Sequence, residues 1–174
     1  MGNLSYELDS ILQKLLSRQK SIRPFPLLSL VDNSQVHKSC SEIYAQALYP
    51  LNPSLGPIMK STRGDKIRIG YFSPDFRSHP VSFLTAELFE VHNRDQFEVY
   101  AFSIREAPTN DAMSVRLKKG FDKFIDIEGM SDQDVAKLAR DLKIDIAVDL
   151  AGYTQNARPG IFSYRTAPIQ INWL

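Results

Sequence analysis

Apolar residues change their spacing along the chain, and the change divides the sequence into three parts. Residues 4–18 and 32–49 place apolar residues three or four positions apart, which predicts two amphipathic helices, the second capped by Asp32 or Asn33. The prolines of "SIRPFPLLSL" between them break a helix. Residues 50–64 are rich in proline and glycine, which is typical of a linker. We therefore expect a helical lead-in over residues 1–49, a linker over residues 50–64 and a main domain over residues 65–174.

Strand patterns alternate with helix patterns throughout the main domain. Short runs of β-branched and aromatic residues predict strands over residues 66–73, 97–104, 123–127, 144–152 and 168–174, with helical segments between them. This alternation predicts an α/β fold, an open parallel sheet covered by helices on both faces. Ligands of such sheets bind outside the carboxyl ends of the strands, which singles out two loops, "SPDFRSHP" at residues 73–80 and "DLAGYTQNARPG" at residues 149–160.

Composition and charge argue against several classes of function. The 174 residues carry a formal net charge of +1 with basic and acidic residues interspersed, so no nucleic-acid partner is expected. No run approaches the length of about 18 apolar residues that spans a membrane. The single cysteine, Cys40, fits a reducing cytoplasm, and its helical context predicts a buried structural thiol. One cysteine and three scattered histidines offer no zinc spacing.

The first loop gathers polar side chains between a strand and a helix. His79 precedes Pro80, so we expect it at or near the N-cap of the helix, where backbone N–H groups favour negative charge. There it could take a proton, donate a hydrogen bond to a substrate hydroxyl or contact a phosphate, while a capping role fits equally well. Asp75 and Arg77 are candidates for substrate binding, but a pair formed across the loop is the simpler interpretation.

The second loop begins with Asp149, near the end of a buried strand where a carboxylate needs a partner. Gly152 allows a tight turn or the close approach of a ligand to the backbone. The hydroxyl, amide and guanidinium groups that follow suit a sugar or phosphate, and they belong to Tyr153, Thr154, Asn156 and Arg158. A well-hydrogen-bonded turn explains the same residues equally well. No Gly-x-Gly-x-x-Gly motif follows the first strand and no Gly-Lys-Ser/Thr loop is present, which disfavours a dinucleotide site or a P-loop.

Long, ordered strings at these two loops resemble a known family. The strings are "KIRIGYFSPDFRSHPVSFL", "FEVYAFS" and "IDIAVDLAGYTQNARPGIFSYRTAPIQINWL", and they look like the first half of the catalytic region of the O-linked N-acetylglucosamine transferase/SPINDLY family. The lead-in "IRPFPLLSLVDNSQVHKSCSEIYAQALY" is similar to the segment that joins that family's tetratricopeptide repeats to its catalytic region. The resemblance begins at about residue 20 and runs to the end of the sequence.

The resemblance implies a GT-B architecture, in which two Rossmann-like lobes enclose the active site and this chain supplies the first. It implies inverting transfer of a sugar from a nucleotide-sugar substrate, UDP-N-acetylglucosamine, to a Ser or Thr hydroxyl of an acceptor protein, with no further cofactor and no metal. The family's active-site His, in its His-Pro motif, falls on His79, as a base or as a positioning group. Thr154 falls where the family's first lobe faces the donor sugar.

Local departures leave the donor sugar open among N-acetylglucosamine, fucose and glucose. Phe83 stands where some relatives carry a second His, and Tyr153 stands where many bacterial relatives carry His. In the family, "APIQINWL" is followed by a glycine-rich turn and a second lobe that holds most of the nucleotide. We therefore expect this chain to be part of a longer protein and to be inactive alone, with self-association through its apolar C-terminal strand. The alternative is a non-catalytic binding or regulatory module with the same fold.

Overall fold

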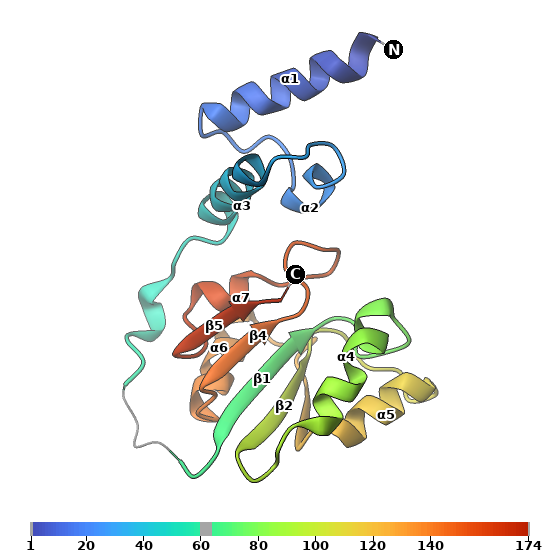
Figure 1. The fold of residues 1–174 in the computed structure, drawn as a ribbon. Helices are drawn as coiled ribbons and strands as arrows, with labels where there is room; N and C mark the ends of the chain where they lie inside the picture. Colours follow the sequence, from blue (N-terminus) through green and yellow to red (C-terminus); the bar gives the residue numbers. More distant parts are fainter. Residues whose placement is uncertain (1, 60–63, 174) are drawn as a thin grey trace. The chain divides into compact units, whose positions relative to one another are not determined.

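The computed structural model describes residues 2–59 and 64–173, and the chain folds into two compact units (Figure 1). The first unit ends at Leu51 and the second begins at Asn52. Part of the predicted linker, residues 60–63, and the last residue of the predicted final strand, Leu174, lie outside the described residues.

The first unit consists of helices α1 (Gly2–Leu16), α2 (Pro24–Leu27) and α3 (Ser34–Leu48). Asn33 caps α3, because its side chain accepts the N–H groups of Gln35 and Val36. The prolines expected to interrupt the helical pattern also begin α2, with Pro24 in its first turn. The side chains of this small core are Leu15, Leu27, Cys40 and Ile43. No helix among the described residues is both long and apolar enough to cross a membrane.

The second unit is built on a parallel sheet in the order β3-β2-β1-β4-β5. The strands are β1 (Ile67–Ser73), β2 (Phe97–Ser103), β3 (Lys123–Asp126), β4 (Ile146–Asp149) and β5 (Ile169–Asn172). Adjacent residues of β1 point to opposite faces, yet Tyr71 and Phe72 are both buried, because helices cover both sides of this strand. The predicted α/β open parallel sheet is confirmed.

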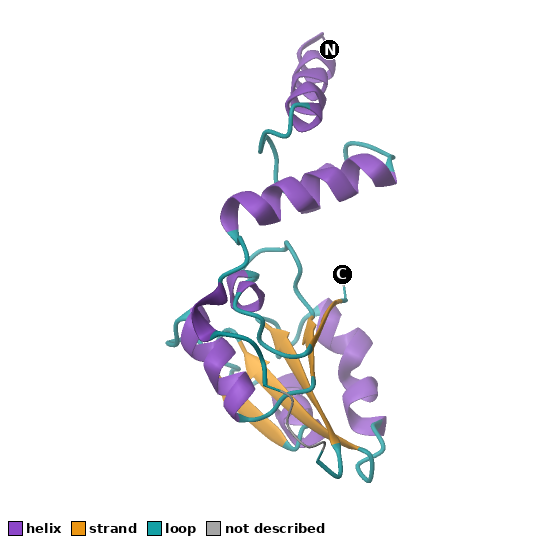
Figure 2. Cartoon of the chain, turned by 90° about the vertical axis from the view of Figure 1, so that its left-hand side faces the viewer, coloured by secondary structure: helices purple, strands orange, loops and turns teal. Residues whose placement is uncertain are grey.

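Two pairs of helices cover the two faces of this sheet (Figure 2). Helices α4 (Pro80–Val91) and α5 (Ala112–Gly120) pack on one face, where Phe89 and Leu117 join the core that contains Tyr71. Helices α6 (Asp132–Asp141) and α7 (Gly160–Ser163) pack on the other, where Val135 and Ile161 join the core that contains Phe72. A 3-10 turn, η1 (Pro53–Leu55), lies earlier in the chain than the first strand.

The strand order places a topological switch between β1 and β4. From β1 the chain proceeds outward through β2 and β3, then returns to the other side of β1 for β4 and β5. In sheets of this kind, the connections that leave two such neighbouring strands diverge, and ligands bind at their carboxyl ends. The register pairs Phe72 of β1 with Asp149 of β4, so the two loops selected from the sequence leave the sheet side by side at this point.

Candidate functional site

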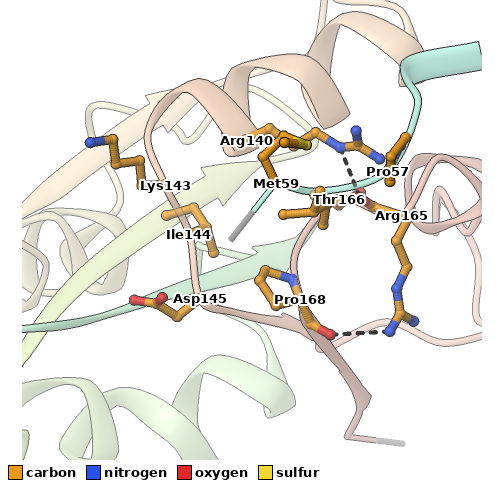
Figure 3. Close-up of a pocket in the computed structure, with 10 residues that line it drawn as sticks. Pro57, Met59, Arg140, Lys143, Ile144, Asp145, Arg165, Thr166 and Pro168 are labelled. Carbon is orange, nitrogen blue, oxygen red and sulfur yellow. Dashed lines mark hydrogen bonds between the residues drawn. The ribbon is translucent and has the colours of Figure 1, made fainter. Parts of the chain in front are cut away.

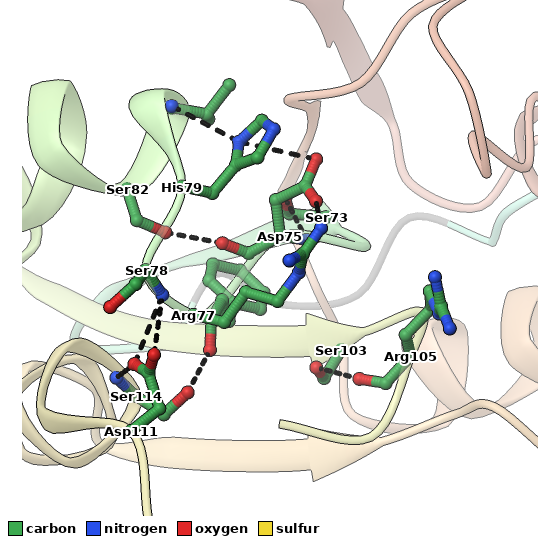
Figure 4. A network of polar contacts seen from close by, with 12 residues as sticks. Ser73, Asp75, Arg77, Ser78, His79, Ser82, Ser103, Arg105, Asp111 and Ser114 are labelled. Atoms are coloured by element: carbon green, nitrogen blue, oxygen red, sulfur yellow. Dashed lines mark hydrogen bonds and ion pairs between the residues drawn. The ribbon is translucent and has the colours of Figure 1, made fainter. Parts of the chain in front are cut away.

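Core packing holds the loop between β1 and α4 in place, and so do the hydrogen bonds shown in Figure 4. Phe76 is 2% exposed and packs edge-on against the rings of Phe121 and Phe124. The hydroxyl of Ser114 on α5 donates to the carbonyl of Phe76 at 2.7 Å. Asp111, the N-cap of α5, accepts the N–H of Ser78 at 3.1 Å through each carboxylate oxygen. The polar tip of the loop is therefore held at fixed positions above the sheet.

Asp75 is the centre of this loop and contacts both of the other candidates. One carboxylate oxygen, Oδ1, accepts from a guanidinium nitrogen of Arg77 at 3.1 Å, and the other, Oδ2, lies 3.6 Å from Nδ1 of His79. Asp75 is only 8% exposed, whereas the side chain of Arg77 is 41% exposed. The predicted pair between Asp75 and Arg77 is confirmed, so the opposite charges of the two side chains partly neutralise each other within the loop.

His79 is the N-cap of α4, as the His-Pro sequence predicts. Its Nδ1 accepts the N–H of Val81 at 3.4 Å, and Pro80 occupies the first turn, where its missing N–H costs nothing. A neutral ring whose Nδ1 accepts carries its hydrogen on Nε2. Nε2 makes no hydrogen bond with a described residue, and a third of the side chain, 33%, is exposed. The structure thus leaves one N–H of His79 free to meet a ligand.

Asp149 organises the start of the second loop. Its Oδ1 accepts the N–H of Ala151 at 2.9 Å and that of Gly152 at 3.1 Å, and Gly152 adopts a left-handed φ of 54°. The carboxylate is 7% exposed, and burial raises its pKa although the two N–H groups oppose the change. The two backbone N–H groups supply the hydrogen bonds that a buried carboxylate requires, so Asp149 has a structural role in this turn.

The hydroxyl and amide groups of the second loop lie in the turn that Asp149 begins. The Thr154 hydroxyl donates to the carbonyl of Ala151 at 2.7 Å, which closes the turn. Tyr153 is half-buried, and Asn156 is exposed with a left-handed φ of 65°. Substrate binding by Tyr153 and Thr154 stays a prediction, and the geometry places both next to the buried Gly152.

Arg158 is engaged with a distant part of the same lobe. Its guanidinium donates to the carbonyls of Ile127 at 3.0 Å and Met130 at 2.7 Å, and it forms an ion pair with Asp132 at 2.6 Å. These contacts fasten the second loop to the segment between β3 and α6. Substrate binding by Arg158 stays a prediction, because the contacts of its guanidinium in the structure are with groups of the protein itself.

The two loops meet at the switch point, where the N–H of Leu150 donates to the carbonyl of Phe72 at 3.0 Å. Sequence reasoning missed the residues that support the first loop, namely Asp111, Ser114 and Ser82, whose hydroxyl donates to the backbone carbonyl of Asp75. Hydrogen bonds from Ser78 and Ser114 lower the pKa of Asp111. The one signal available in the sequence was an Asp, Asp111, at the start of the helical segment between the second and third predicted strands, because Asp is a common N-cap. The described residues contain no group of three or more His, Cys, Asp or Glu side chains arranged to hold a metal ion.

The sequence is similar to known glycosyltransferases. Residues 52–174 match the family model described as glycosyl transferase family 41. The chain is 31% identical over 180 residues to a probable UDP-N-acetylglucosamine–peptide N-acetylglucosaminyltransferase, SEC, of Arabidopsis thaliana, covering 97% of this chain and 18% of that protein. It is 36% identical over 111 residues to the probable transferase SPINDLY of the same plant, covering 62% of this chain and 12% of that protein.

A solved structure supports the same assignment of fold. A mutant O-GlcNAc transferase of Thermobaculum terrenum superposes with a TM-score of 0.69 at 30% identity, covering 83% of this chain and 28% of that one. The chain therefore spans less than a fifth of the two plant relatives, 18% and 12%, and less than a third of the bacterial protein, 28%.

Proposed function

The chain belongs to glycosyl transferase family 41, and we propose that it forms the first catalytic lobe of a protein O-glycosyltransferase. The proposed reaction moves N-acetylglucosamine from UDP-N-acetylglucosamine to a Ser or Thr hydroxyl of an acceptor protein, with inversion at the anomeric carbon. The names of the relatives support this donor. The observation that carries the proposal is the meeting of two polar loops at the β1–β4 switch point, with the Nε2 of His79 unpaired among the described residues.

In this proposal the nucleotide sugar is a substrate, and no further cofactor or metal takes part. The chain spans less than a third of its relatives, 18% of one and 28% of another, so we assign most of the nucleotide contacts to a second lobe. Catalysis needs donor and acceptor held together in near-attack geometry, and one lobe supplies one wall of such a site. The 174-residue chain alone is therefore expected to transfer no sugar. Its lone thiol, Cys40, fits the cytoplasm as the place of action.

We assign His79 the role of a hydrogen-bond donor that positions the substrate. A general base would need an unprotonated Nε2 and therefore a hydrogen on Nδ1. The structure instead uses Nδ1 to accept the N–H of Val81 at 3.4 Å, while the Asp75 oxygen at 3.6 Å lies beyond hydrogen-bond range. Neutral His79 then offers an Nε2–H to a substrate oxygen.

A chimeric enzyme tests the function and this role together. Residues 52–174 would replace the matching segment of the Thermobaculum terrenum transferase, and transfer of labelled sugar to a protein acceptor would be measured. An active chimera supports the proposed function, and an inactive chimera whose fold is intact contradicts it. The same assay and calorimetry with UDP-N-acetylglucosamine on the 174-residue chain should show no turnover. Multiple turnovers by the 174-residue chain alone would refute the proposal that a second lobe is needed for catalysis.

Variants of the chimera separate a donor from a base. His79→Ala should lower turnover by about 10²–10⁴-fold, the usual contribution of a positioned acid–base or orienting group. His79→Asn retains a side-chain N–H donor and a capping oxygen, so it should recover at least about tenfold over alanine. Equal losses in the two variants would contradict the donor role. Glu87→Gln, on the exposed surface of α4, is the matched control and should leave turnover unchanged.

We also propose that β5 mediates self-association of the chain. It is an edge strand, and its apolar side chains Ile169 and Ile171 are 52% and 45% exposed, while Trp173, just after the strand, is 55% exposed. Sedimentation velocity at increasing concentration should reveal dimers or larger species that Ile171→Lys reduces. A concentration-independent monomer would contradict this proposal.

A further inference from the structure

Four side chains that the proposed reaction does not use form a polar cluster at the C-terminal end of α4. The Nε2 of His92, the C-cap of α4, lies 2.9 Å from the hydroxyl of Tyr71 in β1. Arg94 belongs to the turn between α4 and β2, and Asp122 belongs to the link between α5 and β3. The cluster therefore joins the end of α4 to the sheet and to the end of α5.

The hydrogen bond between Tyr71 and His92 has a defined direction. Tyr71 is 5% exposed, and its hydroxyl makes no other hydrogen bond with a described residue. A buried donor without a partner is costly, so the O–H of Tyr71 donates to Nε2. The ring of His92 is therefore neutral in this arrangement and carries its hydrogen on Nδ1.

Arg94 makes this place unfavourable for a second positive charge. Its Nη2 donates to the carbonyls of Phe89 and Gly120, whereas its Nη1 is buried and has no hydrogen-bond partner among the described residues. Nη1 lies 3.6 Å from Oδ2 of Asp122, too far for a hydrogen bond, so the charge of Arg94 is only partly compensated. Burial of His92 and the charge of Arg94 lower the pKa of the imidazole, and Asp122 opposes them.

We propose that His92 is an acid-sensitive latch that holds the C-terminal end of α4 against the sheet. In the protonated ring Nε2 carries a hydrogen and cannot accept from Tyr71, whose buried O–H then lacks an acceptor. The imidazolium also faces the charge of Arg94. Both effects favour a state in which the last turn of α4 separates from Tyr71 and His92 reaches water. The latch is closed at neutral pH and opens in acid.

The direction of this pH dependence follows from the lowered pKa of His92. An unfolded histidine titrates at about pH 6.5. Because the folded pKa is lower, the contribution of His92 to stability is complete above about pH 6.5 and is lost as the pH falls through the folded pKa. Asp149, whose pKa is raised, has the opposite dependence, so the test must resolve single residues.

The latch is separate from the proposed catalytic site and from the pocket shown in Figure 3. His79 and His92 lie at opposite ends of α4, a helix of 12 residues that is therefore about 18 Å long. The pocket, of about 560 Å³, lies at the amino ends of β4 and β5, and none of the four residues of the cluster lines it. The proposal does not depend on sugar transfer, and it can be tested on the 174-residue chain itself.

Hydrogen exchange of single amides, measured by NMR between about pH 5 and pH 7.5, tests the latch. Corrected for intrinsic exchange, the protection of the last-turn amides of α4, from Phe89 to Val91, should fall about tenfold toward acid. In His92→Gln it should stay constant, because the amide oxygen of Gln accepts from Tyr71 at every pH. His37→Gln, in the first unit, is the matched control and should keep the fall. Constant protection in the parent, or a fall that persists in His92→Gln, would overturn the proposal.

Titration of the His92 ring by NMR provides a second test, which decides the matter should His92→Gln not fold. Tyr71→Phe keeps the aromatic ring but removes the donor that favours neutral His92, so it should raise the pKa of His92. Arg94→Gln should also raise this pKa, and Asp122→Asn should lower it, because each removes one neighbouring charge. A pKa in the parent at or above that of an unfolded histidine, or no increase in Tyr71→Phe, would refute the latch.

Discussion

The buried carboxylate of Asp149 allows the energetics of the switch point to be measured with two neutral replacements. Asp149→Asn keeps a carbonyl oxygen where Oδ1 now accepts the N–H groups of Ala151 and Gly152 at 2.9 and 3.1 Å. Asp149→Ala removes the acceptor and leaves both N–H groups buried without a partner. The two variants therefore separate the value of the hydrogen bonds from the cost of burying the charge.

The expected magnitudes follow from these contacts. A buried donor that loses its partner costs about 1–3 kcal/mol, and alanine strands two of them while relieving a buried charge. We expect Asp149→Ala to lose about 2–3 kcal/mol of unfolding free energy at pH 7, and Asp149→Asn to stay within about 1 kcal/mol of the parent. Since about 1 kcal/mol shifts the midpoint of a chain of this size by roughly 2–4 °C, alanine should lower it by about 4–12 °C.

The pH dependence gives a second, independent signature. Burial raises the pKa of Asp149 in the folded chain above that in the unfolded chain, so the folded state binds the proton more tightly. Its contribution to stability is complete below the unfolded pKa of about 4 and is lost as the pH rises through the folded pKa. Asparagine has no such loss, so its stability relative to the parent should increase from about pH 4 toward pH 7.

Thermal unfolding of the three proteins between about pH 4 and pH 7, followed by circular dichroism, measures both effects. Equal destabilisation by asparagine and alanine at pH 7 would show that the hydrogen bonds to Ala151 and Gly152 are not the source of stability. If the stability of the parent instead increased relative to that of the asparagine variant as the pH rises, burial would not raise the pKa of Asp149. Either result would refute the structural account of this turn.

Three further predictions follow from other buried contacts. Arg158→Ala should lower the free energy of unfolding by about 2–4 kcal/mol in chemical denaturation, because two carbonyls and Asp132 lose their donor. Arg158→Lys should recover only part of this loss, because an ammonium cannot donate in the forked geometry of a guanidinium. A loss below about 0.5 kcal/mol for the alanine variant would contradict this prediction. Gly70→Ala should destabilise the sheet by about 1–3 kcal/mol, since an added Cβ would lie 2.9 Å from the Phe102 ring, and an unchanged midpoint would mean that the ring moves aside freely. Cys40 is 1% exposed and burial raises the pKa of its thiol, so its reaction with a disulfide reagent should follow unfolding of the first unit, and rapid labelling of the folded chain would show the thiol to be accessible.

The fold of the second unit could be predicted because its signals are local. Each strand is a short apolar run, and the starts of its helices have their own markers, since Asp111 and Ser131 accept N–H groups of the helices that follow them. The His-Pro sequence likewise predicts the start of α4 at His79. Residues of this type act through neighbours two or three positions away, so the sequence contains the whole interaction.

The candidate site was predicted less completely because its contacts are long-range. The position of both loops at one edge follows from strand alternation, and the pair between Asp75 and Arg77 lies within one short segment. The partners of Arg158, by contrast, are backbone carbonyls about thirty positions earlier, at Ile127 and Met130. No residue type marks a carbonyl that will need a donor, so the sequence cannot distinguish an arginine that binds phosphate from one that fastens two loops.

The number of polar groups in each loop does not indicate which loop offers a free group to a substrate. The second loop contains more polar groups, but Asp149 and Arg158 use them to hold the turn, and the Thr154 hydroxyl closes it. The first loop has fewer polar groups, but it is supported from outside by Ser114 of α5 and by Asp111, the N-cap of that helix. The Nε2 of His79 stays without a partner among the described residues. A group that must meet a substrate needs an unused donor on a rigid base. On this criterion His79 is the residue of the two loops best placed to act on a substrate.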